Sequence, residues 1–147
     1  MFIEILITRQ NPILPAVFQD KFPGRVFNIL KDTGAFMKNK KVLIIDDEED
    51  LGLLLRRFFL PKNIDVYVAH TISEGMRLLE QEKPDFIFLD NNLPDGLGWG
   101  KTDYILVNYP QTQLNLISAL DVPKTSASSF RILEKPLLLE ELTKMFG

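Results

Sequence analysis

The chain has 147 residues, which is enough for one domain with a substantial hydrophobic core. It has no cysteine, one histidine and a formal net charge of −3, and 46% of its residues are hydrophobic. These values exclude a disulfide framework, thiol catalysis, Cys-based zinc sites and multi-histidine metal sites, and they argue against a nucleic-acid partner. Because no apolar run approaches the roughly 18 residues that span a bilayer, no membrane segment is expected either.

Alternating strand and helix patterns begin near residue 40. Short β-branched runs are typical of strands buried on both faces, and apolar residues three and four positions apart are typical of amphipathic helices. The first half of this region predicts a strand at residues 41–45, a helix at 48–59, a strand at Ile64–Ala69 and a helix at 72–81 with Thr71 or Ser73 near its cap. The second half predicts a strand at 85–89, a weaker helix at 99–108 and strands at 114–117 and 130–133. Pro136 opens a last helix.

Two helices have candidate packing residues that the structure can test: Tyr104, Ile105 and Val107 in the weaker helix, and Leu138, Leu139, Leu142 and Met145 in the last one. Residues 121–129 are expected to form a loop. The alternation of strands and helices predicts an α/β fold with a doubly wound, five-stranded parallel sheet and right-handed crossovers. In such sheets, ligands bind at the carboxyl ends of the strands, where the strand order switches.

Polar residues stand at those strand ends. Asp46 and Asp47 end the first strand, Asp90 ends the third, Ser118 the fourth, and Lys135 follows the fifth. Carboxylates brought together repel one another unless a cation intervenes, and hard oxygen ligands suit Mg²⁺. A lysine and a hydroxyl facing such a metal would complete a phosphoryl site, and an aspartate can itself be phosphorylated. Asp47 has an alternative interpretation as the N-cap of the first helix.

The segments IIDDEED, IFLDNNLPDG, LISA and LEKP, each at a strand end, resemble the receiver domain of bacterial two-component response regulators over residues 37–146. The resemblance implies a flavodoxin-like receiver fold, bound Mg²⁺ and a cis Lys–Pro bond at Pro136. It also implies roles for the residues at the strand ends. Asp90 would be the phospho-acceptor and a metal ligand, Asp47 a direct metal ligand, Asp46 a ligand acting largely through water, and the backbone carbonyl of Asn92 the third protein ligand. Lys135 would be the partner of the phosphoryl group, Ser118 the switch hydroxyl and Ala119 the small residue beside the phosphate.

The chain also departs from this family. The 17 positions from Ser118 to Lys135 leave the fourth helix shortened, irregular or absent. The position three residues before Lys135, where the family often has an aromatic residue, is Ile132. Phe130, two residues earlier on the same strand face, is a candidate substitute. We therefore expect the signal to leave through a surface other than that of the fourth helix and fifth strand.

Residues 1–36 have no counterpart in the family and form an N-terminal extension, with the receiver domain at residues 37–147. The extension holds five of the 11 phenylalanines, so it is too apolar for a solvated tail. Two hypotheses remain: translation begins natively at Met37, or the extension supplies packing or an interface.

The sequence thus predicts a cytoplasmic, single-domain response regulator. It would accept a phosphoryl group from a histidine kinase or phosphotransfer protein onto Asp90 and act through protein contacts, with a homodimer left open. It would be a switch rather than an enzyme, catalysing only its own phosphorylation and dephosphorylation. The alternative is a phosphorylation-independent, receiver-like binding module. A phosphatase with an aspartate nucleophile needs a second acid two residues later, where this chain has Asn92.

Overall fold

The computed structural model describes residues 39–119 and 129–147. The expectations for the N-terminal extension, the start at Met37, the fourth helix and most of the loop at 121–129 lie outside these residues. The chain from Lys40 to Gly147 forms one compact unit.

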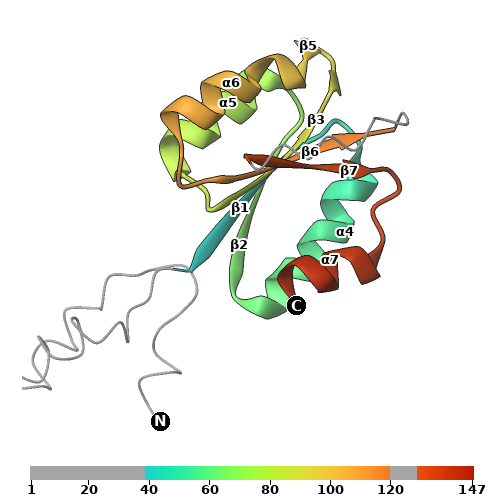
Figure 1. The fold of residues 1–147 in the computed structure, drawn as a ribbon. Helices are drawn as coiled ribbons and strands as arrows, with labels where there is room; N and C mark the ends of the chain where they lie inside the picture. Colours follow the sequence, from blue (N-terminus) through green and yellow to red (C-terminus); the bar gives the residue numbers. More distant parts are fainter. Residues whose placement is uncertain (1–38, 120–128) are drawn as a thin grey trace, which may run out of the picture. The chain divides into compact units, whose positions relative to one another are not determined.

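Five parallel strands form the central sheet, in the spatial order β2-β1-β3-β6-β7 (Figure 1). Their bounds are β1 Lys40–Ile45, β2 Ile64–Ala69, β3 Phe86–Asp90, β6 Gln113–Ser118 and β7 Phe130–Glu134. The predicted five-stranded, doubly wound sheet is therefore confirmed, with each predicted strand within a residue of its position. The strand order reverses between β1 and β3, which places the switch point at the two strands that carry the aspartates.

Helices cover both faces of the sheet. α4 (Glu49–Phe59) and α7 (Leu139–Phe146) lie on one face, and α5 (Ile72–Glu82) and α6 (Thr102–Asn108) lie on the other (Figure 1). Two short 3-10 helices, η1 (Leu60–Lys62) and η2 (Gly98–Lys101), follow α4 and precede α6. Among the residues that the structure describes, no helix has both the length and the apolar character to cross a membrane.

Successive residues of the central strands enter two different hydrophobic clusters. In β1, Leu43 and Ile45 pack with α5 and α6, whereas Val42 and Ile44 pack with α4 and α7. This alternation follows from the period of two in a β-strand, and it explains why these strands are apolar at nearly every position. Phe59 of α4 lies fully buried in the second cluster, with its ring centroid 5.9 Å from that of Phe88 and 5.3 Å from that of Phe146.

Two details of the helix prediction are wrong. In α6, Ile105 is fully buried as predicted, but Tyr104 and Val107 are 51% and 76% exposed. This helix has only seven residues, so a narrow stripe of it faces the sheet.

The last helix begins at Leu139 rather than at Pro136. Leu138 and Leu139 are exposed, because Leu137, before the helix, fills the second cluster together with Leu142. The packing that we predicted for Leu138 and Leu139 of the last helix is thus provided by Leu137, in the segment that precedes the helix.

Candidate functional site

Three aspartates meet at the switch point of the sheet. β1 and β3 are neighbours, with Ile45 paired to Leu89, so the residues that follow each strand emerge side by side. The carboxylates of Asp46, Asp47 and Asp90 each offer an oxygen, and these oxygens all lie within 4.8 Å of one another. Asp46 and Asp90 are only 1% and 4% exposed, whereas Asp47 is exposed. The structure thus brings together the three carboxylates that the sequence predicted to converge.

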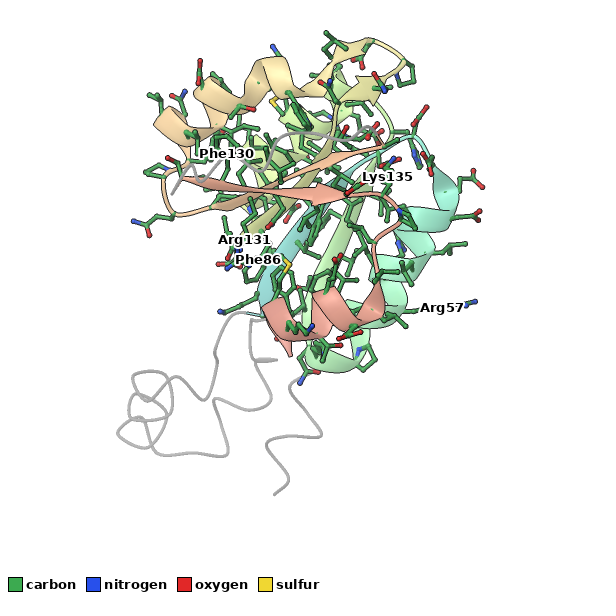
Figure 2. The ribbon with its side chains drawn as sticks, turned by 45° about the vertical axis from the view of Figure 1, so that its right-hand side comes forward. Arg57, Phe86, Phe130, Arg131 and Lys135 are labelled. Atoms are coloured by element: carbon green, nitrogen blue, oxygen red, sulfur yellow. The ribbon has the colours of Figure 1, made fainter. Side chains whose placement is uncertain are left out.

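Lys135 reaches this acidic cluster from β7. Its Nζ lies 2.8 Å from Asp46 Oδ2 and 3.2 Å from Asp90 Oδ1. It also lies 2.9 Å from Glu48 Oε1. Lys135 directly follows the carboxyl end of β7 (Figure 2), and its peptide bond to Pro136 is cis. The predicted convergence of lysine and aspartates is therefore present.

The charges at this rim perturb one another. Burial raises the pKa of Asp90 above its usual value, and the charge on Asp46 adds to this shift, while Lys135 partly offsets it. Burial by itself would lower the pKa of Lys135, but its contacts with Asp46 and Glu48 and the charge on Asp90 outweigh burial, so that pKa is raised. Lys135 is thus held charged, whereas the surroundings of Asp90 disfavour the charged form of its carboxyl group.

Backbone amides orient two of the carboxylates. Asp46 Oδ1 accepts a hydrogen bond from the amide of Glu48 at 2.7 Å, and Asp90 Oδ2 accepts one from the amide of Asn92 at 3.1 Å. Glu48, not Asp47, occupies the N-cap position of α4, and no side chain caps that helix. The alternative role of Asp47 as a helix cap is therefore wrong, which leaves its carboxylate available to a ligand.

The acidic cluster fits a small divalent cation. Mg²⁺ binds oxygen at about 2.1 Å, so two ligand oxygens on opposite sides of it lie about 4.2 Å apart. The oxygens of the three aspartates, all within 4.8 Å of one another, lie close enough together to turn toward one such cation. Asp46 Oδ2 is also buried without a hydrogen bond of good geometry, although Lys135 lies close to it. A buried acceptor with an unused lone pair is what a cation satisfies.

The loop after Asp90 is a tight hairpin, which we call the acceptor loop (residues 91–98). β4 (Asn92–Leu93) pairs antiparallel with β5 (Gly96–Leu97) around a turn at Pro94 and Asp95. Gly96 has a φ of 140°, a conformation that side chains rarely adopt. A Cβ added to Gly98 would stand 2.0 Å from the carbonyl oxygen of Asp90, so only glycine allows the loop to close against the strand end.

The remaining predicted residues lie on the neighbouring strands. Ser118 is buried at the end of β6, and its carbonyl oxygen accepts a hydrogen bond from the amide of Lys135 at 2.8 Å. Ala119 follows it and is exposed. Phe130 and Ile132 of β7 pack against the same hydrophobic cluster, which confirms that they share one face of the strand.

Two residues at this rim were missed. Glu48 was assigned no role at the site, but it forms an ion pair with Lys135. His70, which was also assigned no role, has its Nδ1 3.1 Å from the backbone carbonyl oxygen of Asp46. The strand-end rule contains the signal for both, because Glu48 follows Asp47 directly and His70 follows the end of β2, the neighbour of β1.

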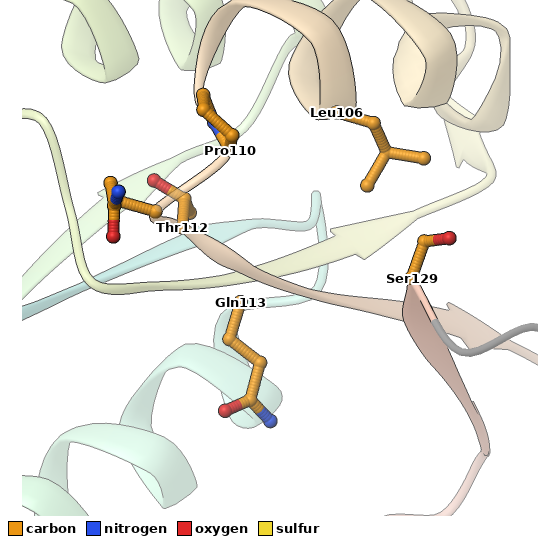
Figure 3. Close-up of a pocket in the computed structure, with 6 residues that line it drawn as sticks. Leu106, Pro110, Thr112, Gln113 and Ser129 are labelled. Carbon is orange, nitrogen blue, oxygen red and sulfur yellow. The ribbon is translucent and has the colours of Figure 1, made fainter.

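A cavity of about 500 Å³ lies elsewhere, near the starts of β6 and β7 (Figure 3). Its lining includes Leu106, Thr112, Gln113 and Ser129. Since Gln113 begins β6 and Ser129 precedes β7, this cavity is at the opposite end of the sheet from the acidic cluster.

Known proteins resemble this chain in both sequence and fold. The family model described as "Response regulator receiver domain" matches residues 42–146. The response regulator protein PilR of Pseudomonas aeruginosa is 34% identical over 114 residues, which cover 74% of this chain and 26% of PilR. The KDP operon transcriptional regulatory protein KdpE of Escherichia coli K12 is 31% identical over 110 residues, which cover 69% of this chain and 47% of KdpE. The chain therefore spans between a quarter and a half of the length of these relatives.

A solved structure of a response regulator also resembles this chain in its fold. The crystal structure of a two-component response regulator from Clostridium difficile matches with a TM-score of 0.64 and 27% identity, covering 73% of this chain and 92% of that one. From its sequence and its fold, this chain belongs to the response regulator receiver domain family.

Proposed function

We propose that this receiver domain accepts a phosphoryl group onto Asp90 in a Mg²⁺-dependent step. Receiver domains are phospho-accepting signalling switches that bind Mg²⁺ at an acidic cluster. The observation that carries the assignment to Asp90 is its position, buried at a strand end between Lys135 and two further carboxylates.

In the proposed reaction, a carboxylate oxygen of Asp90 attacks the phosphorus of a phosphohistidine, the P–N bond breaks and a P–O bond forms. Asp46, Asp47 and the backbone carbonyl of Asn92 would hold Mg²⁺, which supplies positive charge to the phosphoryl oxygens. Lys135, which now contacts Asp90 at 3.2 Å, would turn to the phosphoryl group, and the Ser118 hydroxyl would donate to one of its oxygens. Ala119 leaves room beside the incoming group, and hydrolysis of the acyl phosphate would reset the switch.

The proposed donor is a histidine kinase or a phosphotransfer protein, and the proposed output is contact between the receiver, residues 37–147, and a protein partner. One relative, the sporulation initiation phosphotransferase F of Bacillus subtilis, has phosphoryl transfer in its name. A cytoplasmic location stays a prediction of the family resemblance.

Labelling with a small phosphodonor tests the acceptor. Acetyl phosphate with Mg²⁺ should give the wild-type protein a hydroxylamine-sensitive mass increase of one phosphoryl group, and Asp90→Asn should abolish it. Asp103→Asn is the matched control, because Asp103 is an exposed aspartate on α6 outside the cluster, and it should label normally. Labelling that persists in Asp90→Asn would remove Asp90 from its role.

A wild-type protein that neither labels nor responds to Mg²⁺ would instead favour the phosphorylation-independent binding module. The Mg²⁺ response is accessible through the single tryptophan, Trp99, which directly follows the acceptor loop. Its fluorescence should change on addition of Mg²⁺ and again with beryllofluoride.

A further inference from the structure

One side chain links the acceptor loop to helix α5. Asp95, at the tip of the hairpin, accepts a hydrogen bond from the amide of Ile72 at its Oδ1, at 2.8 Å. Its Oδ2 accepts a second one from the amide of Ser73 at 2.9 Å. Both amides belong to the first turn of α5, where N–H groups have no partner within the helix. Asp95 therefore caps a helix that begins 23 residues earlier in the chain.

Helix α5 also has a cap of its own. The Thr71 hydroxyl oxygen accepts a hydrogen bond from the amide of Glu74 at 3.1 Å, in the usual N-cap geometry. The first turn thus receives one cap from its own sequence and a second from the acceptor loop. Unlike the cap by Thr71, the cap by Asp95 connects α5 to the acceptor loop.

The acceptor loop needs such an anchor. Its hairpin has two residues in each strand, and an isolated two-stranded hairpin is marginal in water even when longer. At its base, Asn92 donates its amide to Asp90 and Gly98 donates its amide to the carbonyl oxygen of Asn91 at 2.8 Å. At its tip, the two hydrogen bonds of Asp95 fix the turn. The backbone of Asn92 therefore lies between a fixed base and a fixed tip.

We infer that Asp95 is a positioning residue, which holds the Asn92 carbonyl for the metal and couples the metal site to the first turn of α5. This inference rests on the proposed function. Coupling between two sites is reciprocal, so an anchored α5 strengthens Mg²⁺ binding by the same factor by which Mg²⁺ strengthens the anchor. Binding of Mg²⁺ at the acidic cluster therefore stabilises the first turn of α5, on this face of the sheet.

The test compares the two caps of one helix. Calorimetric Mg²⁺ titrations of the full chain should give a dissociation constant about fivefold higher for Asp95→Ala than for the wild type, the factor that corresponds to one helix cap. Asp95→Asn keeps one acceptor oxygen and should fall between them. Thr71→Ala removes a cap without touching the loop, so it should lower the melting temperature and leave the Mg²⁺ dissociation constant unchanged.

Hydrogen exchange measures the reciprocal effect, that of Mg²⁺ binding on the first turn of α5. Mg²⁺ should slow exchange at the amides of Ile72 and Ser73 in the wild type and in Thr71→Ala, but not in Asp95→Ala. If Asp95→Ala does not fold, Asp95→Asn provides the comparison for both measurements.

Two outcomes would overturn the inference, and they are distinguishable. Equal Mg²⁺ affinities in the wild type and the Asp95 variants, or exchange at α5 that ignores Mg²⁺, would remove the coupling and leave the proposed function standing. A wild-type protein that binds no Mg²⁺ would remove both.

Discussion

At the acidic cluster, one ammonium group faces four carboxylates. Lys135 forms ion pairs with Asp46, Glu48 and Asp90, and Asp47 stands beside them. These five side chains carry a formal charge of −3, since four negative charges face one positive charge. Such a site is unfavourable by itself and attractive to a divalent cation, which is the electrostatic basis of a metal-dependent switch.

The raised pKa of Asp90 has a consequence for stability. Above its ordinary pKa of 3.8, the unfolded chain releases a proton that the folded protein still holds, so stability falls as the pH rises through the folded value. At neutral pH without metal, Asp90→Asn should therefore increase the free energy of unfolding, because it removes the disfavoured charge and leaves Lys135 paired with Asp46 and Glu48.

Urea denaturation in the presence of EDTA, repeated from pH 7 down to pH 4, measures this effect. The advantage of Asp90→Asn should shrink as the pH approaches the ordinary carboxyl range. A variant that is less stable than the wild type at pH 7 would show that Lys135 compensates for the burial of Asp90 in full.

At this scale, sequence reasoning found the residues that backbone position determines. Asp46, Asp90 and Lys135 follow strand ends, and the strand order of a doubly wound sheet brings those ends together. It missed the ion pair of Glu48 and the contact of His70, because both depend on where a side chain turns after it leaves the backbone. It assigned Asp95 no role, since a cap supplied by a residue 23 positions away leaves no local pattern.

Among the elements, α4 is fixed to the sheet by aromatic packing. The ring of Phe59 is fully buried between the rings of Phe88 and Phe146, which come from β3 and α7. Helix periodicity predicted an amphipathic helix here, because an apolar stripe must find a partner. It failed for α6 and for the start of α7, where short length and the buried Leu137 override the pattern.

Phe59→Ala should lower the free energy of unfolding by about 3–5 kcal/mol, because it opens a cavity at the junction of three elements. Leu53→Ala, on the exposed side of the same helix, should change it by about 0.5 kcal/mol or less. Chemical denaturation of both variants measures the difference. Similar losses in the two variants would mean that helix propensity, rather than packing, governs α4.

For the whole molecule, stability and metal binding are linked. A ligand that binds the folded state alone stabilises it by about 2.7 kcal/mol at 100 times its dissociation constant. At that concentration, Mg²⁺ should raise the melting temperature by about 10 °C. Asp47→Asn should lose this shift, since Asp47 is an exposed member of the acidic cluster whose substitution leaves the core intact.

Thermal scans with Mg²⁺ and with EDTA provide the measurement, and Asp103→Asn should keep the wild-type shift. A Mg²⁺-dependent shift that survives in Asp47→Asn would place the cation somewhere other than the acidic cluster.

The division of the strand side chains between two hydrophobic clusters determines how the effects of core substitutions on stability combine. Because Leu43 and Ile45 face one helix layer and Val42 and Ile44 face the other, the sheet backbone separates two cores that share few side-chain contacts. Losses from truncating Leu79 on one side and Leu55 on the other should sum, since effects at sites without common neighbours are additive. Substitutions in the two layers then draw on the same free energy of unfolding without amplifying one another, so a change in the packing of α5 and α6 leaves the packing of the opposite layer undisturbed.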